Sequence, residues 1–141
     1  MAKPRILLDT NIILDVLASR APFYSHSAGV WAAVESGQVE GWVAAHSITT
    51  LFYSIKRQTS QKLAIQAISD LLRVFSVVAI DYSILMQALT LDWPDFEDAV
   101  QACAAVQTGL NFLITRDQAG YPDDLIPVVS PQEFLSVLHS M

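Results

Sequence analysis

Short apolar runs alternate along this chain with longer segments of helical periodicity. The run from Ile6 to Leu8 ends in Asp9 and is typical of a buried strand. Further strands are expected over residues 39–45, 77–80, 111–115 and 128–129. Between these runs apolar residues recur every three or four positions, which predicts helices. The predicted helices cover residues 11–18, 24–36, 47–57, 61–75, about 84–88, 96–108 and 131 onward.

Residues at the ends of these segments support the predicted boundaries. Ser47 and Thr59 are suitable N-caps for two of the helices, and Gly109 is a suitable C-terminal stop. The segment 130–133 reads Ser-Pro-Gln-Glu, which combines an N-cap serine, a first-turn proline and a capping-box glutamate. Strands that alternate with helices predict a parallel sheet covered by helices on both faces, an α/β fold.

The composition is that of a folded domain. The chain has 141 residues, of which 52% are hydrophobic and 16% are charged. This balance excludes disorder, and the length predicts a single domain over residues 1–141. No apolar run is long enough to span a bilayer, and Asp9, Asn11 and Asp15 interrupt the only stretch that resembles a signal peptide. We therefore expect a cytoplasmic protein with no membrane partner.

The charge balance limits how the protein could handle a polyanion. Fourteen acidic residues against eight basic ones give a net charge of −6, which argues against a broad basic face for nucleic acid. Lys56 and Arg57 are adjacent bases, and Arg116 stands alone. These three side chains could meet RNA phosphates, or they could simply be solvated charges. A polyanion would require local neutralisation of the acids, for which a divalent cation is the obvious candidate.

Acidic residues occur where the predicted parallel strands end. Asp9 follows the first strand and Asp117 closely follows the fourth, while Asp95 and Asp98 begin the helix at 96–108. Ligands in parallel sheets bind beyond the carboxyl ends of the strands, so these acids could share one cleft. Clustered carboxylates suit Mg²⁺ or Mn²⁺. Each acid also has an ordinary interpretation as a helix cap, a first-turn acid or a turn residue.

Three segments together resemble the successive motifs of PIN domains, and most of all the VapC-type toxin ribonucleases. They are Leu8-Asp9-Thr10-Asn11-Ile12-Ile13-Leu14-Asp15, Asp95-Phe96-Glu97-Asp98-Ala99 and Ile114-Thr115-Arg116-Asp117. The resemblance implies a three-layer α/β/α sandwich and cleavage of RNA with Mg²⁺ or Mn²⁺. It also implies a homodimer and an antitoxin partner. By motif match the catalytic and metal-binding acids are Asp9, Asp98 and Asp117, with accessory roles for Asp95, Thr50, Thr115 and Asn11.

The chain departs from the PIN pattern at one important position. The family usually carries a further acid on the helix after the second strand, and Thr50 stands at the matching place. Residues 41–60 contain no acid at all. Gly120 likewise stands where many relatives carry another carboxylate. A threonine hydroxyl supplies no charge to a metal site, so metal affinity and activity are expected to be weaker than in the family.

Two other functions remain open from the sequence. The first is a PIN-like module that binds metal or RNA but has lost catalysis, as the departure at Thr50 suggests. The second is a phosphatase of the haloacid dehalogenase type, which also begins with an apolar strand and an aspartate. That class requires a second aspartate two residues later, where this chain has Asn11. No serine–histidine or cysteine–histidine pattern points to covalent catalysis.

Overall fold

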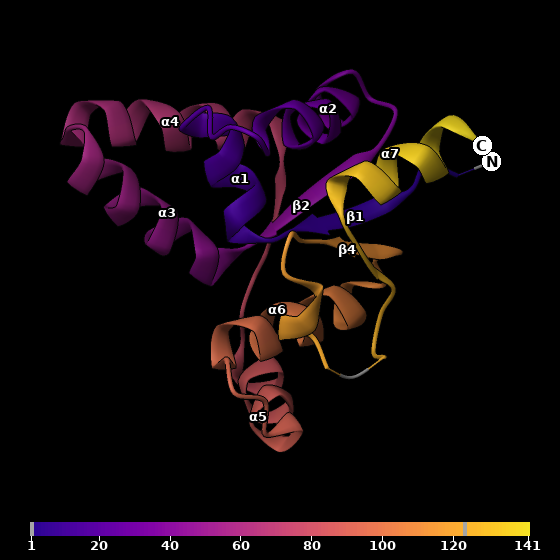
Figure 1. Ribbon diagram of the computed structural model, residues 1–141. Coiled ribbons are helices and arrows are strands. Elements are labelled where there is room, and N and C mark those ends of the chain that lie inside the picture. The colour runs from indigo at the N-terminus through magenta and orange to yellow at the C-terminus, as the bar shows by residue number, and fades with distance from the viewer. Residues whose placement is uncertain (1, 123) are drawn as a thin grey trace.

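The computed structural model describes residues 2–122 and 124–141, and five parallel strands form its central sheet (Figure 1). The strands are β1 (Arg5–Leu8), β2 (Glu40–Ala44), β3 (Ser76–Val78), β4 (Phe112–Ile114) and β5 (Val128–Val129). The helices are α1 (Thr10–Leu17), α2 (Tyr24–Glu35), α3 (Ala45–Gln58), α4 (Gln61–Val74), α5 (Tyr82–Leu91), α6 (Phe96–Thr108) and α7 (Pro131–His139), with a 3₁₀ turn, η1, at Gln118–Gly120.

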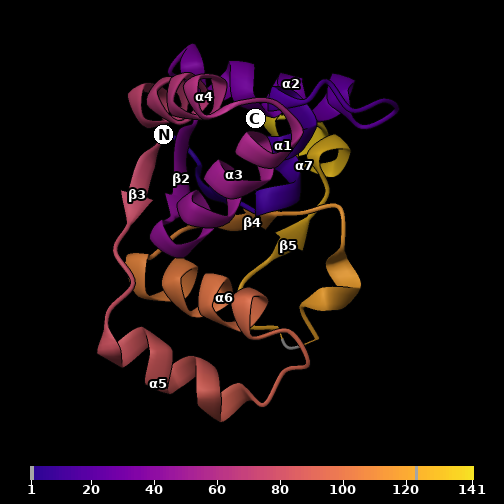
Figure 2. The ribbon, with the colours of Figure 1, turned by 90° about the vertical axis from the view of Figure 1, so that its left-hand side faces the viewer.

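Helices cover both faces of the sheet, which confirms the predicted three-layer α/β/α sandwich. Helices α1, α2, α3, α4 and α7 lie on one face, and α5 and α6 lie on the other (Figures 1 and 2). Strand β1 divides its side chains accordingly: Ile6 and Leu8 pack into the first layer, and Leu7 packs into the second. All three side chains are fully buried. This two-sided burial explains why the strand reads as a continuous apolar run.

Three predicted boundaries are wrong. Ser47 does not cap α3, because the helix begins two residues earlier at Ala45 and Ser47 is buried within its first turn. Ser60 rather than Thr59 caps α4, and its side chain accepts a hydrogen bond from the amide of Leu63. Strand β3 ends at Val78 instead of residue 80, because its partner β2 ends at the paired Ala44 and continues as α3.

The strand order predicts a ligand-binding crevice beside β1. The order is β3-β2-β1-β4-β5. Strands β2 and β3 are therefore added on one side of β1, and β4 and β5 are added on its other side. The order therefore reverses between β1 and β4, where open parallel sheets bind their ligands. These two strands are in register, with Leu8 opposite Ile114, and the amide of Asp9 donates to the carbonyl of Ile114 at 2.9 Å. The segments after β1 and β4 therefore leave the sheet side by side.

Candidate functional site

Asp9 is the buried centre of the crevice between β1 and β4. It is only 6% exposed and acts as the N-cap of α1. Its Oδ1 accepts hydrogen bonds from the Thr10 amide at 2.6 Å and from Gln101 Nε2 at 2.9 Å. Its Oδ2 accepts from the Thr115 hydroxyl at 2.7 Å and from the Tyr121 hydroxyl at 3.1 Å. Four donors from separate parts of the chain thus satisfy one buried carboxylate.

The first turn of α6 brings the second pair of acids to the crevice. Asp95 is the N-cap of α6, and its Oδ1 accepts a hydrogen bond from the Asp98 amide at 3.1 Å. Asp98 is half-buried and lies 3.3 Å from the Tyr121 hydroxyl through its Oδ1. Asp95 and Asp98 can thus have the ordinary roles of acids at a helix start and also line the crevice.

Gln101 and Tyr121 connect the acids to one another, and the sequence analysis missed both. Gln101 Nε2 donates to Asp9 and, at 3.0 Å, to the Tyr121 hydroxyl oxygen. The Tyr121 hydroxyl has one hydrogen, which it can donate to Asp9 or to Asp98 but not to both. Both side chains are buried, and burial is the largest of the effects that raise the pKa of Tyr121, followed by the charges of Asp9 and Asp98. The tyrosine therefore stays protonated between the two carboxylates.

Burial, together with the charges of its neighbours, changes the protonation of Asp98. Its pKa is raised from an ordinary 3.8 to about 7, chiefly by burial and then by the charges of Asp9 and Asp95. The charge of Asp117 raises it slightly further, and the hydrogen bond with Tyr121 opposes these effects. A proton on Asp98 could be donated to the Tyr121 oxygen while Tyr121 donates to Asp9. The cluster therefore has a site for positive charge, which a proton or a cation can fill.

Asp117 faces Asp98 across Gly120. A Cβ placed on Gly120 would lie 2.8 Å from Asp98 Oδ2 and 3.2 Å from Asp117 Oδ2, so these two oxygens are at most 6.0 Å apart. The Asp117 amide donates to the Thr115 hydroxyl at 3.1 Å, which links it to the Asp9 network. Asp117 is exposed, in contrast to Asp9. The hydrogen at Gly120 leaves open the space that a side chain there would fill.

Arg116 is held away from this cluster by an ion pair. Its Nε lies 2.7 Å from Oδ2 of Asp15, and its Nη2 lies 3.1 Å from Oδ1. Asp15 is fully buried in α1 and also accepts a hydrogen bond from Ser27 at 3.2 Å. The guanidinium of Arg116 lies 3.8 Å from the centre of the Phe23 ring. Arg116 therefore fixes the segment before Asp117 to α1, and its charge is already neutralised.

Helix α3 forms the other wall and carries no acid. Ser47 is buried, with its hydroxyl 3.5 Å from Oε1 of Gln101. Thr50 lies one turn further along α3 and is exposed. Lys56 and Arg57 are exposed in the last turn, and neither forms an ion pair among the residues that the structure describes. The sequence-predicted residues on α3 therefore line its outer surface, and Ser47 alone reaches the buried network.

Asn11 makes only a long contact within the site. Its Nδ2 lies 3.5 Å from the Thr115 hydroxyl, and in the described part of the chain its buried Oδ1 has no hydrogen-bond partner. The oxygens gathered here are of the kind that Mg²⁺ and Mn²⁺ prefer. Among the described residues, however, no three His, Cys, Asp or Glu side chains are arranged so that they could hold one ion. The donor chemistry fits a hard divalent cation, but the structure does not present a completed coordination sphere.

Comparisons with known proteins place this chain beside one family. The PIN domain family model matches residues 5–119. Ribonuclease VapC1 of Aquifex aeolicus is 21% identical over 139 residues, which is 95% of each chain. The structure of Mycobacterium tuberculosis VapC20, a toxin that cleaves the sarcin-ricin loop, matches 77% of this chain and 86% of its own, with a TM-score of 0.64 and 16% identity. DNA-bound VapBC of Salmonella typhimurium matches 91% and 98%, with a TM-score of 0.71 and 13% identity.

Replacing Asp98 by asparagine should stabilise the metal-free protein at neutral pH. Because the folded state raises the pKa of Asp98, the folded protein binds this proton more tightly than the unfolded chain does. Wild-type stability attributable to this group is therefore lost as the pH rises from about 4 to about 7. Asp98→Asn does not lose stability in this way. Above pH 7 we therefore expect its free energy of unfolding to exceed that of the wild type by about 1–2 kcal/mol, after solvent screening is allowed for.

Urea unfolding in chelator at pH 5 and pH 8 measures this difference. Glu97→Gln is the matched control, because Glu97 is an exposed acid in the same first turn of α6. An equal gain in both variants would attribute the effect to relief of the general negative charge of the protein, which is −6, and not to the carboxylate cluster.

Proposed function

This chain belongs to the PIN domain family, and from that premise we propose that it is a Mg²⁺- or Mn²⁺-dependent endoribonuclease, the toxin of a toxin–antitoxin pair. The observation that carries the proposal is the gathering of Asp9, Asp98 and Asp117 where the strand order reverses. The similarity to ribonuclease VapC1 over 95% of both chains supports the same activity. Residues 1–141 act in this proposal as one PIN-like domain in the cytoplasm.

The side chains of the crevice divide into two groups in this proposal. Asp9, Asp98 and Asp117 would hold the metal, with Asp95 and Asn11 beside them. When bound, the ion supplies a water of lowered pKa and stabilises the charge that develops on the phosphate. Thr115, Gln101 and Tyr121 fix the Asp9 carboxylate through hydrogen bonds. These three side chains hold the two oxygens of Asp9 in a fixed orientation while a polyanion approaches. Repulsion among the acids makes the binding of a cation favourable.

Purified protein should cleave generic single-stranded RNA with Mn²⁺ or Mg²⁺ and should not do so in chelator. Asp9→Asn, Asp98→Asn and Asp117→Asn should each reduce the rate by at least about 100-fold, because each removes a charge that positions the ion. Gel analysis of labelled RNA measures the products. Asp124→Asn is the matched control, because Asp124 is an exposed acid outside the cluster. Cleavage that continues in chelator would contradict the proposal.

A PIN-like module that binds metal or RNA without cleaving it is the second candidate. The observation in its favour is that α3 presents the hydroxyl of Thr50 and no carboxylate. Metal binding by the purified protein, with no cleavage under any divalent cation, is the result that favours this candidate. Rapid loss of RNA with Mn²⁺ is the result that excludes it.

Thr50→Glu tests whether α3 contributes to the metal site. A fourth carboxylate should tighten Mn²⁺ binding by about tenfold, because a charged oxygen is available in place of a neutral hydroxyl. Without metal it should lower stability, because like charges repel. Titration calorimetry and thermal unfolding of both proteins measure these effects. Thr49→Glu is the matched control, since Thr49 is exposed on the same helix but points about 100° away. An equal change in both variants would remove Thr50 from the site.

We also propose that the chain forms a homodimer and is bound by an antitoxin. Among the described residues no helix is long and apolar enough to cross a membrane. Ile65 and Leu72 of α4, which are seven residues apart and share one face of the helix, are about half exposed, at 51% and 48%. In contrast, Val30 and Val34 of α2 are buried and are not available to a partner. Apolar area of this kind on α4 is typical of an interface.

Light scattering at micromolar concentration should give twice the 15.5 kDa chain mass. A constant monomer mass across that range would contradict the dimer, and would leave α4 available to the antitoxin alone.

A further inference from the structure

We propose that one face of α3 binds single-stranded RNA and guides it to the carboxylate cluster. This face, the α3 track, consists of His46, Thr50, Tyr53 and Arg57, with Lys56 beside it. The inference deepens the proposed ribonuclease function by naming where the substrate strand lies. It assigns base stacking to Tyr53 and phosphate contacts to Lys56 and Arg57.

The spacing of the four residues places them along one line. They follow one another at intervals of four, three and four residues, and such positions share a face of an α-helix. The eleven steps from His46 to Arg57 rise by about 16 Å along the helix axis. Leu51 faces the core from another side of the helix and is fully buried, so α3 is fixed in place beneath its outer face. The track is therefore a straight strip on a rigid element, long enough to bind a few nucleotides.

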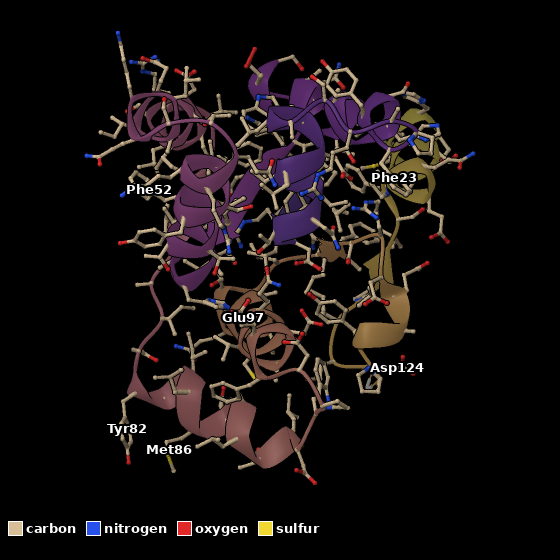
Figure 3. All side chains as sticks on the ribbon, turned by 60° about the vertical axis from the view of Figure 1, so that its left-hand side comes forward. Phe23, Phe52, Tyr82, Met86, Glu97 and Asp124 are labelled. Carbon is tan, nitrogen blue, oxygen red and sulfur yellow. The ribbon has the colours of Figure 1, made fainter. Side chains whose placement is uncertain are left out.

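The inner end of the track adjoins the acids. Nε2 of His46 lies 3.3 Å from the carbonyl oxygen of Glu97, the residue immediately before Asp98. Figure 3 shows Glu97 at the start of α6, close to the first turn of α3. The next residue of α3, Ser47, contacts Gln101, which itself donates to Asp9. The track thus begins at the reacting end of the crevice, and α3 leads away from α6 toward its own C-terminus (Figure 1).

The charge distribution favours a polyanion on this face. Residues 41–69 contain no Asp or Glu, but they contain Lys56, Arg57 and Lys62, three of the eight basic residues in a chain of net charge −6. Helix α3 lies entirely within this segment. Phosphates would therefore meet local positive charge along α3, although the molecule as a whole repels them.

Tyr53 provides the aromatic surface that single-stranded binding requires. It is 61% exposed, and with Lys56 and Arg57 it lines a surface hollow of about 430 Å³. A base can stack on an exposed ring while its phosphates contact the neighbouring cations, and this combination is typical of sites for single strands. A protein partner could also use an exposed tyrosine. The contact of this face with the catalytic crevice favours the strand whose phosphates must reach the acids.

Binding of a fluorescein-labelled RNA of about ten nucleotides, followed by anisotropy in chelator, tests the track without cleavage. Tyr53→Ala should weaken binding about tenfold through lost stacking. Arg57→Ala should weaken it several-fold and reduce the slope of log K against log salt concentration by about 0.7. With Mn²⁺, Tyr53→Ala should raise KM and leave kcat nearly unchanged, because Tyr53 lies outside the carboxylate cluster.

Two matched controls separate the track from general surface effects. Tyr82→Ala removes a 77% exposed tyrosine from α5, which lies beyond α6 from α3 and carries its side chain outward (Figures 2 and 3). Arg73→Ala removes an exposed arginine of α4 that is paired with Asp70. Both should bind RNA as the wild type does. All four replaced side chains are exposed, so thermal unfolding should show intact folds.

The outcomes distinguish the track from the proposed activity. Weakened RNA binding in the track variants supports the track even if the wild type cleaves nothing with any metal, a result that would refute only the nuclease. If the wild type cleaves RNA and the track variants bind it as the controls do, the track is overturned and the activity stands. Absence of RNA binding by the wild type, or loss of dimer or antitoxin binding alone in the variants, also overturns the track.

Discussion

The buried charge of Asp9 is the constraint on which the crevice depends. A carboxylate that is almost fully removed from water costs several kcal/mol unless donors surround it. Hydrogen bonds to a charged group contribute about 1.5–3 kcal/mol each, so four of them offset a cost of that size. They come from the start of α1, from α6, from the end of β4 and from Tyr121. Satisfying one side chain therefore fixes the relative positions of all the elements that carry the other acids.

The layers and the parallel sheet could be predicted because they depend on local apolar patterns. Fully buried strands read as continuous apolar runs, and the segments between them show helical spacing. The residues at which the helices begin were harder to predict from the sequence. A serine or threonine near a start predicts a cap, yet Ser47 is instead used inside α3, where it contacts Gln101. The sequence pattern predicts Thr59 as the cap of α4, but Ser60, one position later, is the residue that makes the capping hydrogen bond. Such choices are decided by tertiary contacts, which local patterns do not contain.

The acids of the site were predictable for a different reason. Asp9 and Asp117 follow strands that the sequence already identifies, and parallel strands end at one edge of the sheet. Gln101 and Tyr121 had no comparable signal, because they reach Asp9 from 92 and 112 residues away. The polar Gln101 within the apolar run of α6 was the one available indication, since a buried amide requires partners. The charge of Arg116 predicts a contact with RNA phosphates, and spacing alone does not reveal that Arg116 pairs with the buried Asp15.

An acidic protein that acts on a polyanion must separate its charges in space. Here the acids of the site gather where β1 and β4 end and where α6 begins, and the only charged residues among 41–69, a segment that includes all of α3, are basic. Repulsion among the acids makes a cation favourable there and discourages phosphates until one is bound. The bases on α3 act within a Debye length of about 8 Å, so they can hold a strand near the acids without changing the net charge. If the proposed function holds, the absence of a carboxylate at Thr50 would have two opposite effects: it would weaken the metal site and keep the α3 wall attractive to RNA.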